Sequence, residues 1–115
     1  MLGERELKKG STHTLILAVL DEGPLHGYAI AREIERRTDD ALRISEGSLY
    51  PALRSLENDE FVASTWEVQA SGPARRIYKL TEKGKGALAQ QVSMWRQFTK
   101  AVTAVIGGEP NARTA

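Results

Sequence analysis

The pattern of apolar and polar positions predicts helices in the first part of the chain. Residues 12–20 are apolar on nearly every side, which is typical of a buried helix, and residues 4–9 extend the pattern weakly. Turn residues at 21–24 end this helix. From about Tyr28, apolar and charged residues alternate at helical spacing, which predicts a second, amphipathic helix ending in the polar segment 38–40.

A third helix follows, and two serines compete for its start. Ser45 is a suitable N-cap, with Ile44 and Leu49 at the two positions of a hydrophobic staple. Pro51 would then lie where its ring and missing N–H disturb the helix, whereas capping by Ser48 places it in the first turn. We therefore expect a loose first turn from Ser45 and a regular helix from Ser48.

This third helix has two contrasting faces. Leu49, Leu53 and Leu56, spaced four and three apart, form an apolar face for a core. The opposite face is small and polar, with one positive charge. It carries Gly47, Pro51, Arg54, Ser55 and Asn58, with Tyr50 on its flank.

Two runs rich in β-branched and aromatic residues, 61–68 and 75–80, predict a β-hairpin with its connection at 69–74. Three short helices followed by a hairpin are the order of a winged helix-turn-helix. The predicted fold is therefore mainly α with a small β-hairpin, and it includes one further long helix at the C-terminal end.

That last helix is predicted from a Thr81 N-cap to about Ile106, before the glycines at 107–108 and Pro110. A helix of about 25 residues is roughly 37 Å long, which is more than so small a domain can cover. Its apolar residues recur every three or four positions, which predicts a seam for a second copy and hence a homodimer; the alternative is a helix folded back on its own domain, although three short helices give it little to lie along. The seam consists of Leu88, Val92, Trp95, Phe98 (or Thr99), Val102 and Ile106.

Length and composition fit one small domain. The chain has 115 residues, 41% of them apolar, and no cysteine. We expect a winged helix-turn-helix domain at 1–80, a dimerisation helix at 81–108 and a flexible tail at 109–115. The longest apolar run, at 15–20, is too short to cross a membrane, and no signal peptide opens the chain, so we expect a cytoplasmic protein without a membrane partner.

The charge distribution leaves nucleic-acid binding open. The net charge is only +1, but the segment 71–80 holds Arg75, Arg76 and Lys79 and no acidic residue. This cluster is either a solvated loop or a contact for phosphates. Alternation along the strand places Arg76 on the face of Tyr78 and Arg75 on the other face with Lys79, so we expect only part of the cluster to contact DNA.

In a winged helix-turn-helix the third helix enters the major groove of double-stranded DNA and the wing contacts the backbone. Arg54 lies on the polar face and can donate two hydrogen bonds to guanine. Tyr28 and Tyr50 can either contact DNA or pack between helices. The predicted DNA-contact residues are Ser45, Gly47, Ser48, Tyr50, Pro51, Arg54, Arg75, Arg76 and Tyr28.

Three segments resemble the PadR family of bacterial transcriptional regulators. They are Gly-Pro-Leu-His-Gly-Tyr-Ala-Ile at 23–30, Gly-Ser-Leu-Tyr-Pro-Ala-Leu at 47–53, and the run from Arg75 to Gly84. The similarity covers about 15–95 and indicates the compact subfamily with one C-terminal helix. It implies a dimeric regulator, which we expect to be a repressor of an inverted-repeat operator.

The resemblance also bears on Trp95, His26 and Glu60. A tryptophan on the last helix of drug-responsive family members lines an apolar pocket at the dimer centre, so Trp95 either binds a small aromatic effector or packs as an ordinary interface residue. His26 is implied to fix the start of the second helix. Where the family usually has glycine after the third helix, this chain has Glu60, so either Glu60 or Asn58 takes the left-handed conformation.

The sequence also bears on two other functional classes. A low basic excess favours a protein-interaction module that uses the winged-helix surface or the long helix. An enzyme is disfavoured because the sequence offers no nucleophile–base pair, phosphate-binding glycine loop or paired carboxylates. With two histidines and no cysteine, we expect no metal site and no cofactor.

Overall fold

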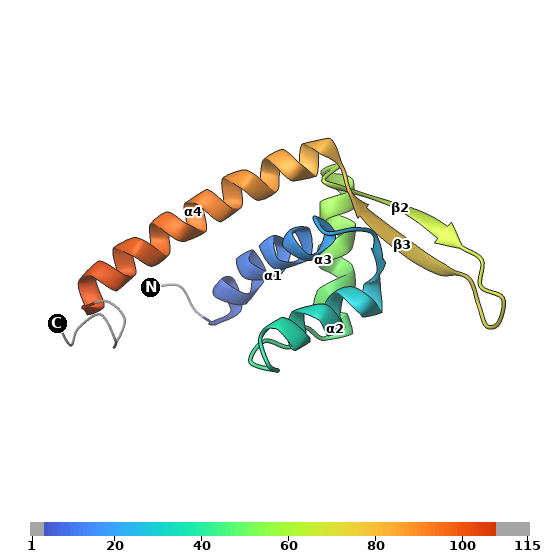
Figure 1. Cartoon of the computed structure of the whole chain (residues 1–115), viewed down its shortest axis with the longest axis horizontal. Helices are drawn as coiled ribbons and strands as arrows, with labels where there is room; N and C mark the ends of the chain where they lie inside the picture. Colours follow the sequence, from blue (N-terminus) through green and yellow to red (C-terminus); the bar gives the residue numbers. More distant parts are fainter. Residues whose placement is uncertain (1–3, 108–115) are drawn as a thin grey trace.

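The computed structural model describes residues 4–107 (Figure 1). Its elements, in chain order, are α1 (Glu4–Leu20), β1 (Leu25–His26), α2 (Gly27–Arg37), α3 (Glu46–Asn58), β2 (Val62–Glu67), β3 (Arg75–Leu80) and α4 (Glu82–Ile106). The expected helix–hairpin–helix order is confirmed, and α1 includes the weak extension that begins at Glu4. The tail predicted at 109–115 and the predicted stop residues Gly108 and Pro110 lie outside the described residues.

The elements form a small helical body with two projections. The strands β2 and β3 extend from it in one direction as a wing, and α4 runs away in the other (Figure 1). The principal extents of 58 × 28 × 26 Å reflect this elongated shape. Along the body α4 lies against α1, where the Thr14 hydroxyl donates a hydrogen bond of 2.7 Å to Gln91 Oε1.

The core lies where α1, α2 and α3 meet the base of the sheet. Burial of these aliphatic side chains is the main stabilising contribution, at about 1.5–3 kcal/mol for each fully buried one. The predicted apolar face of α3 is confirmed as part of this core. The largest fully buried side chains are Ile16, Leu17, Ile30, Ile34, Leu49, Leu53, Leu56 and Val62.

The sheet has three antiparallel strands in the order β1-β3-β2, one more than the predicted hairpin. The additional strand β1 pairs Leu25 with Tyr78 and His26 with Ile77. Two residues are too few to show an alternating pattern, so the sequence predicts no strand after the turn at 21–24. His26 also stands at the N-cap of α2 with extended backbone, but its side chain makes no capping bond.

The start of α3 differs from the predicted regular helix beginning at Ser48. The helix begins at Glu46, with Ser45 as its N-cap, and the Ser45 carbonyl accepts from the N–H groups of Ser48 (3.0 Å) and Leu49 (2.8 Å). Pro51 therefore lies inside the helix, where it has no N–H to donate to the carbonyl of Gly47. Burial of the apolar face of α3 outweighs this one missing bond.

The end of α3 shows which residue adopts the left-handed conformation where the family usually has glycine. Glu60 has φ 64°, and Asn58 remains helical. The N–H of Glu60 donates to Glu57 O (3.0 Å) and that of Phe61 to Leu56 O (2.9 Å), which is the hydrogen-bond pattern of a Schellman motif. Glu60 thus adopts the left-handed conformation in place of glycine, at a cost of about 1–2 kcal/mol.

Thr81 joins the start of α4 to the turn after α3. Its hydroxyl lies 2.6 Å from the carbonyl of Glu60 and 3.1 Å from that of Phe61, and it accepts a hydrogen bond from Gly84 N at 2.9 Å. The predicted Thr81 N-cap is confirmed. At the other end, α4 stops at Gly107 with φ 98°, as the glycine there predicts.

Candidate nucleic-acid interface

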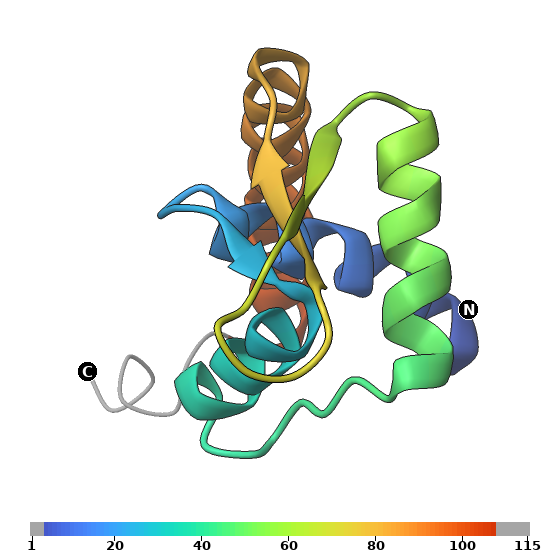
Figure 2. The same ribbon diagram turned by 90° about the vertical axis from the view of Figure 1, so that its right-hand side faces the viewer.

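The exposed face of α3 is small and polar. Leu49, Leu53 and Leu56 are turned into the core, and the opposite side of the helix faces solvent beside the wing (Figure 2). Such a face allows close approach to base edges in a major groove. Exposed on α3 and its N-cap are the predicted contact residues Ser45, Gly47, Ser48, Tyr50, Pro51 and Arg54.

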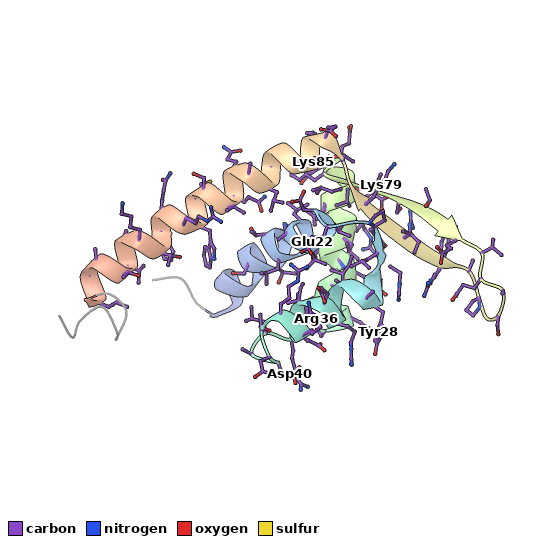
Figure 3. All side chains as sticks on the ribbon, in the orientation of Figure 1. Glu22, Tyr28, Arg36, Asp40, Lys79 and Lys85 are labelled. Carbon is purple, nitrogen blue, oxygen red and sulfur yellow. The ribbon has the colours of Figure 1, made fainter. Side chains whose placement is uncertain are left out.

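Tyr50 both packs between helices and retains a solvent-exposed surface. A Cβ atom on Gly27, the first residue of α2, would lie 2.9 Å from Cε1 of the Tyr50 ring. The ring is nevertheless 40% exposed. Tyr28 is more exposed and points away from the body (Figure 3), with the guanidinium of Arg32 at 5.7 Å from its ring centre.

The two wing arginines lie on opposite faces of the sheet, as the alternation predicts. Arg75 pairs across the strands with Glu67, and its Nε donates to Glu67 Oε1 at 3.1 Å. This pair is about half exposed and adds little to stability. Arg75 is thereby directed away from α3.

Arg76 lies on the face that meets α3. Its Nε donates to Ser64 Oγ at 2.7 Å, and its Nη2 lies 3.6 Å from Glu57 Oε2. The guanidinium carbon is 5.5 Å from the ring centre of Trp66. Both wing arginines thus have carboxylate neighbours, so the positive charge of the wing is partly balanced within the chain.

A group of polar side chains, the α3–wing cluster, therefore connects α3 with the wing. Tyr50, Arg54 and Glu57, spaced four and three apart, come from α3, and Tyr78 is buried at the base of the wing. Burial raises the pKa of the Tyr78 hydroxyl, while the nearby positive charge of Arg76 acts in the opposite direction. The Tyr78 phenol is therefore neutral at physiological pH.

Sequence reasoning missed Glu57, Ser64 and Trp66 in the α3–wing cluster. Ser64 and Trp66 share the period-two face of the buried Val62, which was a usable signal. Glu57 follows Arg54 by three positions in α3, but an acidic side chain does not by itself suggest DNA binding. The approach of the wing to α3 is a tertiary contact, and no local pattern in the sequence reports it.

The predicted seam on α4 divides into two parts. Leu88 is buried in the core of its own chain, and Val92 is half-buried against the same core. Farther along, the stripe is open to solvent. The rings of Trp95 and Phe98 stack at 5.8 Å between centres. The exposed apolar side chains are Trp95, Phe98, Val102 and Ile106 from the predicted seam, with Met94 and Val105 beside them.

Two further findings concern residues 4–107 only. No group of three or more histidine, cysteine, aspartate or glutamate side chains within that range is arranged to hold a metal ion. None of the helices in the same range is long and apolar enough to span a bilayer.

Helices α1 to α3 with the wing define a winged helix-turn-helix, a class of DNA-binding domain. The sequence model of the transcriptional regulator PadR-like family matches residues 16–90. The chain therefore belongs to this family, and the family is one of transcriptional regulators and not of enzymes.

Three relatives illustrate the similarity. A transcriptional regulator of Mycobacterium tuberculosis is 31% identical over 105 residues, which cover 91% of this chain and 92% of that one. The negative transcriptional regulator PadR of Bacillus subtilis is 27% identical over 73 residues, covering 64% and 40%. The structure of a transcriptional regulator from Clostridium thermocellum superposes with a TM-score of 0.80 at 28% identity, covering 86% and 96%.

Proposed function

We propose that this PadR-like regulator is a homodimeric repressor that binds an inverted-repeat operator in double-stranded DNA. The observation that carries the proposal is the exposed polar face of α3 beside an arginine-bearing wing. The Bacillus subtilis relative is a negative regulator, which favours repression over activation. The expected cytoplasmic location follows from the proposed DNA partner.

Base reading is assigned to α3 and phosphate contact to the wing. Arg54 is exposed and is the basic residue of α3 suited to a bidentate contact with guanine. Ser45, Gly47, Ser48 and Pro51 allow the helix to approach closely. Arg75 and Arg76 contact the backbone, and their carboxylate neighbours keep the affinity for unrelated DNA low.

Dimerisation is assigned to the second part of α4. Residues 95–106 carry exposed apolar side chains on the same face that Leu88 buries farther back. A second copy of this helix supplies a matching stripe, and a two-fold axis then presents two α3 helices to an inverted repeat. Trp95 and Phe98 lie in this stripe, where a flat apolar effector can insert.

A gel-shift titration against the DNA upstream of the gene tests the DNA-binding surface. Arg54→Ala and Arg75→Ala should each weaken specific binding by about tenfold or more, because each removes a charged hydrogen-bond donor. Arg96→Ala removes the same charge from α4 and serves as the matched control. Specific binding that survives both α3 and wing substitutions would show that the contact surface lies elsewhere.

The effector is tested by fluorescence in a Trp66→Phe background, where Trp95 is the remaining tryptophan of the chain, and by DNA release from the chain that keeps Trp66. A panel of planar aromatic compounds should include one that quenches Trp95 emission and releases DNA. A Trp95→Ala variant should keep DNA binding but lose release by that compound. Release that persists in Trp95→Ala, or a panel without any quencher, would leave Trp95 as an interface residue only.

A further inference from the structure

Glu57 is an acidic residue in the proposed DNA-binding surface, and its contacts connect α3 to both strands of the wing. Ser64 Oγ, on β2, donates to Glu57 Oε2 at 2.6 Å. Arg76 Nε, on β3, donates to the same Ser64 Oγ at 2.7 Å, and Arg76 Nη2 lies 3.6 Å from Glu57 Oε2. Three side chains from three elements thus close a triangle of polar contacts.

Trp66 restricts the guanidinium of Arg76 from another side. Its ring centre lies 5.5 Å from Arg76 Cζ, so the cation is drawn to the ring face. The Arg76 side chain still has 44% of its surface exposed. A guanidinium has five N–H donors, and the contacts with Ser64 and Glu57 engage only part of them. The remaining donors are available to a ligand at the angle between α3 and the wing.

We propose that Glu57 and Ser64 are positioning residues that hold the Arg76 guanidinium between α3 and the wing, ready to bind one DNA phosphate. This proposal rests on the proposed DNA-contact surface. A free arginine loses rotamer freedom when it binds a phosphate, and a guanidinium already fixed on three sides has less freedom to lose. Within residues 4–107, Arg75 is held by Glu67 alone on the opposite face and lacks such a frame.

The direction in which one substitution changes the affinity for DNA distinguishes a positioning role from a purely electrostatic one. A carboxylate close to DNA repels phosphates, so Glu57→Gln should tighten binding if only net charge mattered. If Glu57 positions Arg76, the same substitution should weaken binding. Glu67→Gln removes an identical charge beside Arg75 and is the matched control, for which binding should stay the same or tighten.

The experiment measures affinity at several salt concentrations for a duplex selected by the wild-type protein from a random pool. Arg76→Ala should weaken binding about tenfold and reduce the slope of log affinity against log salt by about one, because one phosphate contact is lost. Glu57→Gln and Ser64→Ala should weaken binding several-fold with a smaller change of slope, because Arg76 can still reach the phosphate but loses more freedom on binding it. Ser64→Thr keeps the hydroxyl and should keep the affinity.

A double variant completes the test. In the Arg76→Ala background, Glu57→Gln should cause no further loss, since the residue that it positions is already absent. Circular dichroism and thermal melting verify folding, and Ser64→Ala carries the test if Glu57→Gln does not fold. Tighter binding by Glu57→Gln, or an equal loss with and without Arg76, overturns the positioning role alone. An Arg76→Ala variant with unchanged affinity and slope overturns the wing contact as well.

Discussion

The phenol ring of Tyr50 lies directly against Gly27. The ring fits there because Gly27 has no side chain. A Cβ at Gly27 would be 2.9 Å from Tyr50 Cε1 and 3.0 Å from its hydroxyl oxygen. This contact joins the first turn of α2 to α3. It ties the motif around Gly27 to the motif around Tyr50, two segments that are separate in the sequence.

Gly27→Ala should therefore affect DNA binding more than stability. The ring can swing outward, so the free energy of unfolding should fall by less than about 1 kcal/mol. Displacement of Tyr50 along the flank of α3 should weaken operator binding several-fold. Thermal melting and gel shifts on the same preparation measure the two effects. Gly47→Ala, which meets only Ser45 Oγ at 3.8 Å, tests a methyl group on α3 without this collision.

Gly84 and Gly86 lie two positions apart in α4, and substitution of each by alanine should change the free energy of unfolding in opposite directions. A Cβ at Gly84 would lie 2.0 Å from the carbonyl oxygen of Phe61, which is backbone and cannot move aside cheaply. Gly84→Ala should lower the free energy of unfolding by about 1–3 kcal/mol.

Gly86 has nothing within 4 Å of the corresponding position, so Gly86→Ala should stabilise the helix by up to about 1 kcal/mol. Denaturant unfolding of both variants measures the difference. Equal effects of the two substitutions would contradict the close approach of α4 to the residue before β2.

Glu33 should make stability depend on acid pH. Its carboxylate accepts hydrogen bonds from Arg36 (2.6 and 3.0 Å) and Arg37 (2.9 Å). These bonds, first from Arg36 and then from Arg37, lower the pKa of Glu33 from 4.5 to about 2. Because the folded pKa is depressed, the stabilisation is present above pH 4.5 and is lost as the pH falls through 2.

Glu33→Gln should accordingly lower the melting temperature at pH 7 and differ less and less from wild type between pH 4.5 and 2. Glu35→Gln on the same helix is the control, since the Glu35 carboxylate lies 4.0 Å from Arg32 and makes a weaker pair. A gap between Glu33→Gln and wild type that stays constant with pH would show that the charge of Glu33 is not the cause.

Phe98→Glu should break the proposed dimer. Phe98 is 50% exposed at the centre of the open stripe, and a carboxylate there would have to be buried against the apolar side chains of a second copy. Self-association should weaken by at least about thirtyfold. Gln97→Glu adds the same charge on the opposite side of α4, and its sedimentation should match that of wild type. A dimer that tolerates Phe98→Glu would place the interface elsewhere.

Much of the fold was predictable because local signals agreed. The leucine spacing predicts the buried face of α3, and the Thr81 cap and the glycine at 107 predict the two ends of α4, as the structure confirms. Ser45 caps α3, which is where we expected its first turn to begin, but the regular helix starts before Ser48 and includes Pro51, because core packing of the whole helix outweighs the local effect of the proline. The strand at Leu25 was missed because only its pairing with Tyr78 makes it a strand.

The candidate site was predictable in its exposed residues and not in their partners. Strand alternation assigned Arg75 and Arg76 to opposite faces, which the structure confirms. That Glu57 approaches Arg76 depends on the angle between α3 and the wing, and helical periodicity within one element carries no information on that angle. Leu88 illustrates the same limit, since its spacing fits the stripe of α4 while its neighbours belong to the core.

The Thr81 hydroxyl, set between the carbonyls of Glu60 and Phe61 and the N–H of Gly84, acts as a joint between the body and α4. In the proposed dimer joined along α4, this joint and the packing of α4 against α1 together set the angle at which each α4 helix leaves its body. A tilt of a few degrees at the joint is magnified along α4 into a shift of ångströms at α3. In the proposed dimer, the distance between the two α3 helices would thus depend on the Thr81 hydroxyl and its backbone partners, which lie far from any base pair.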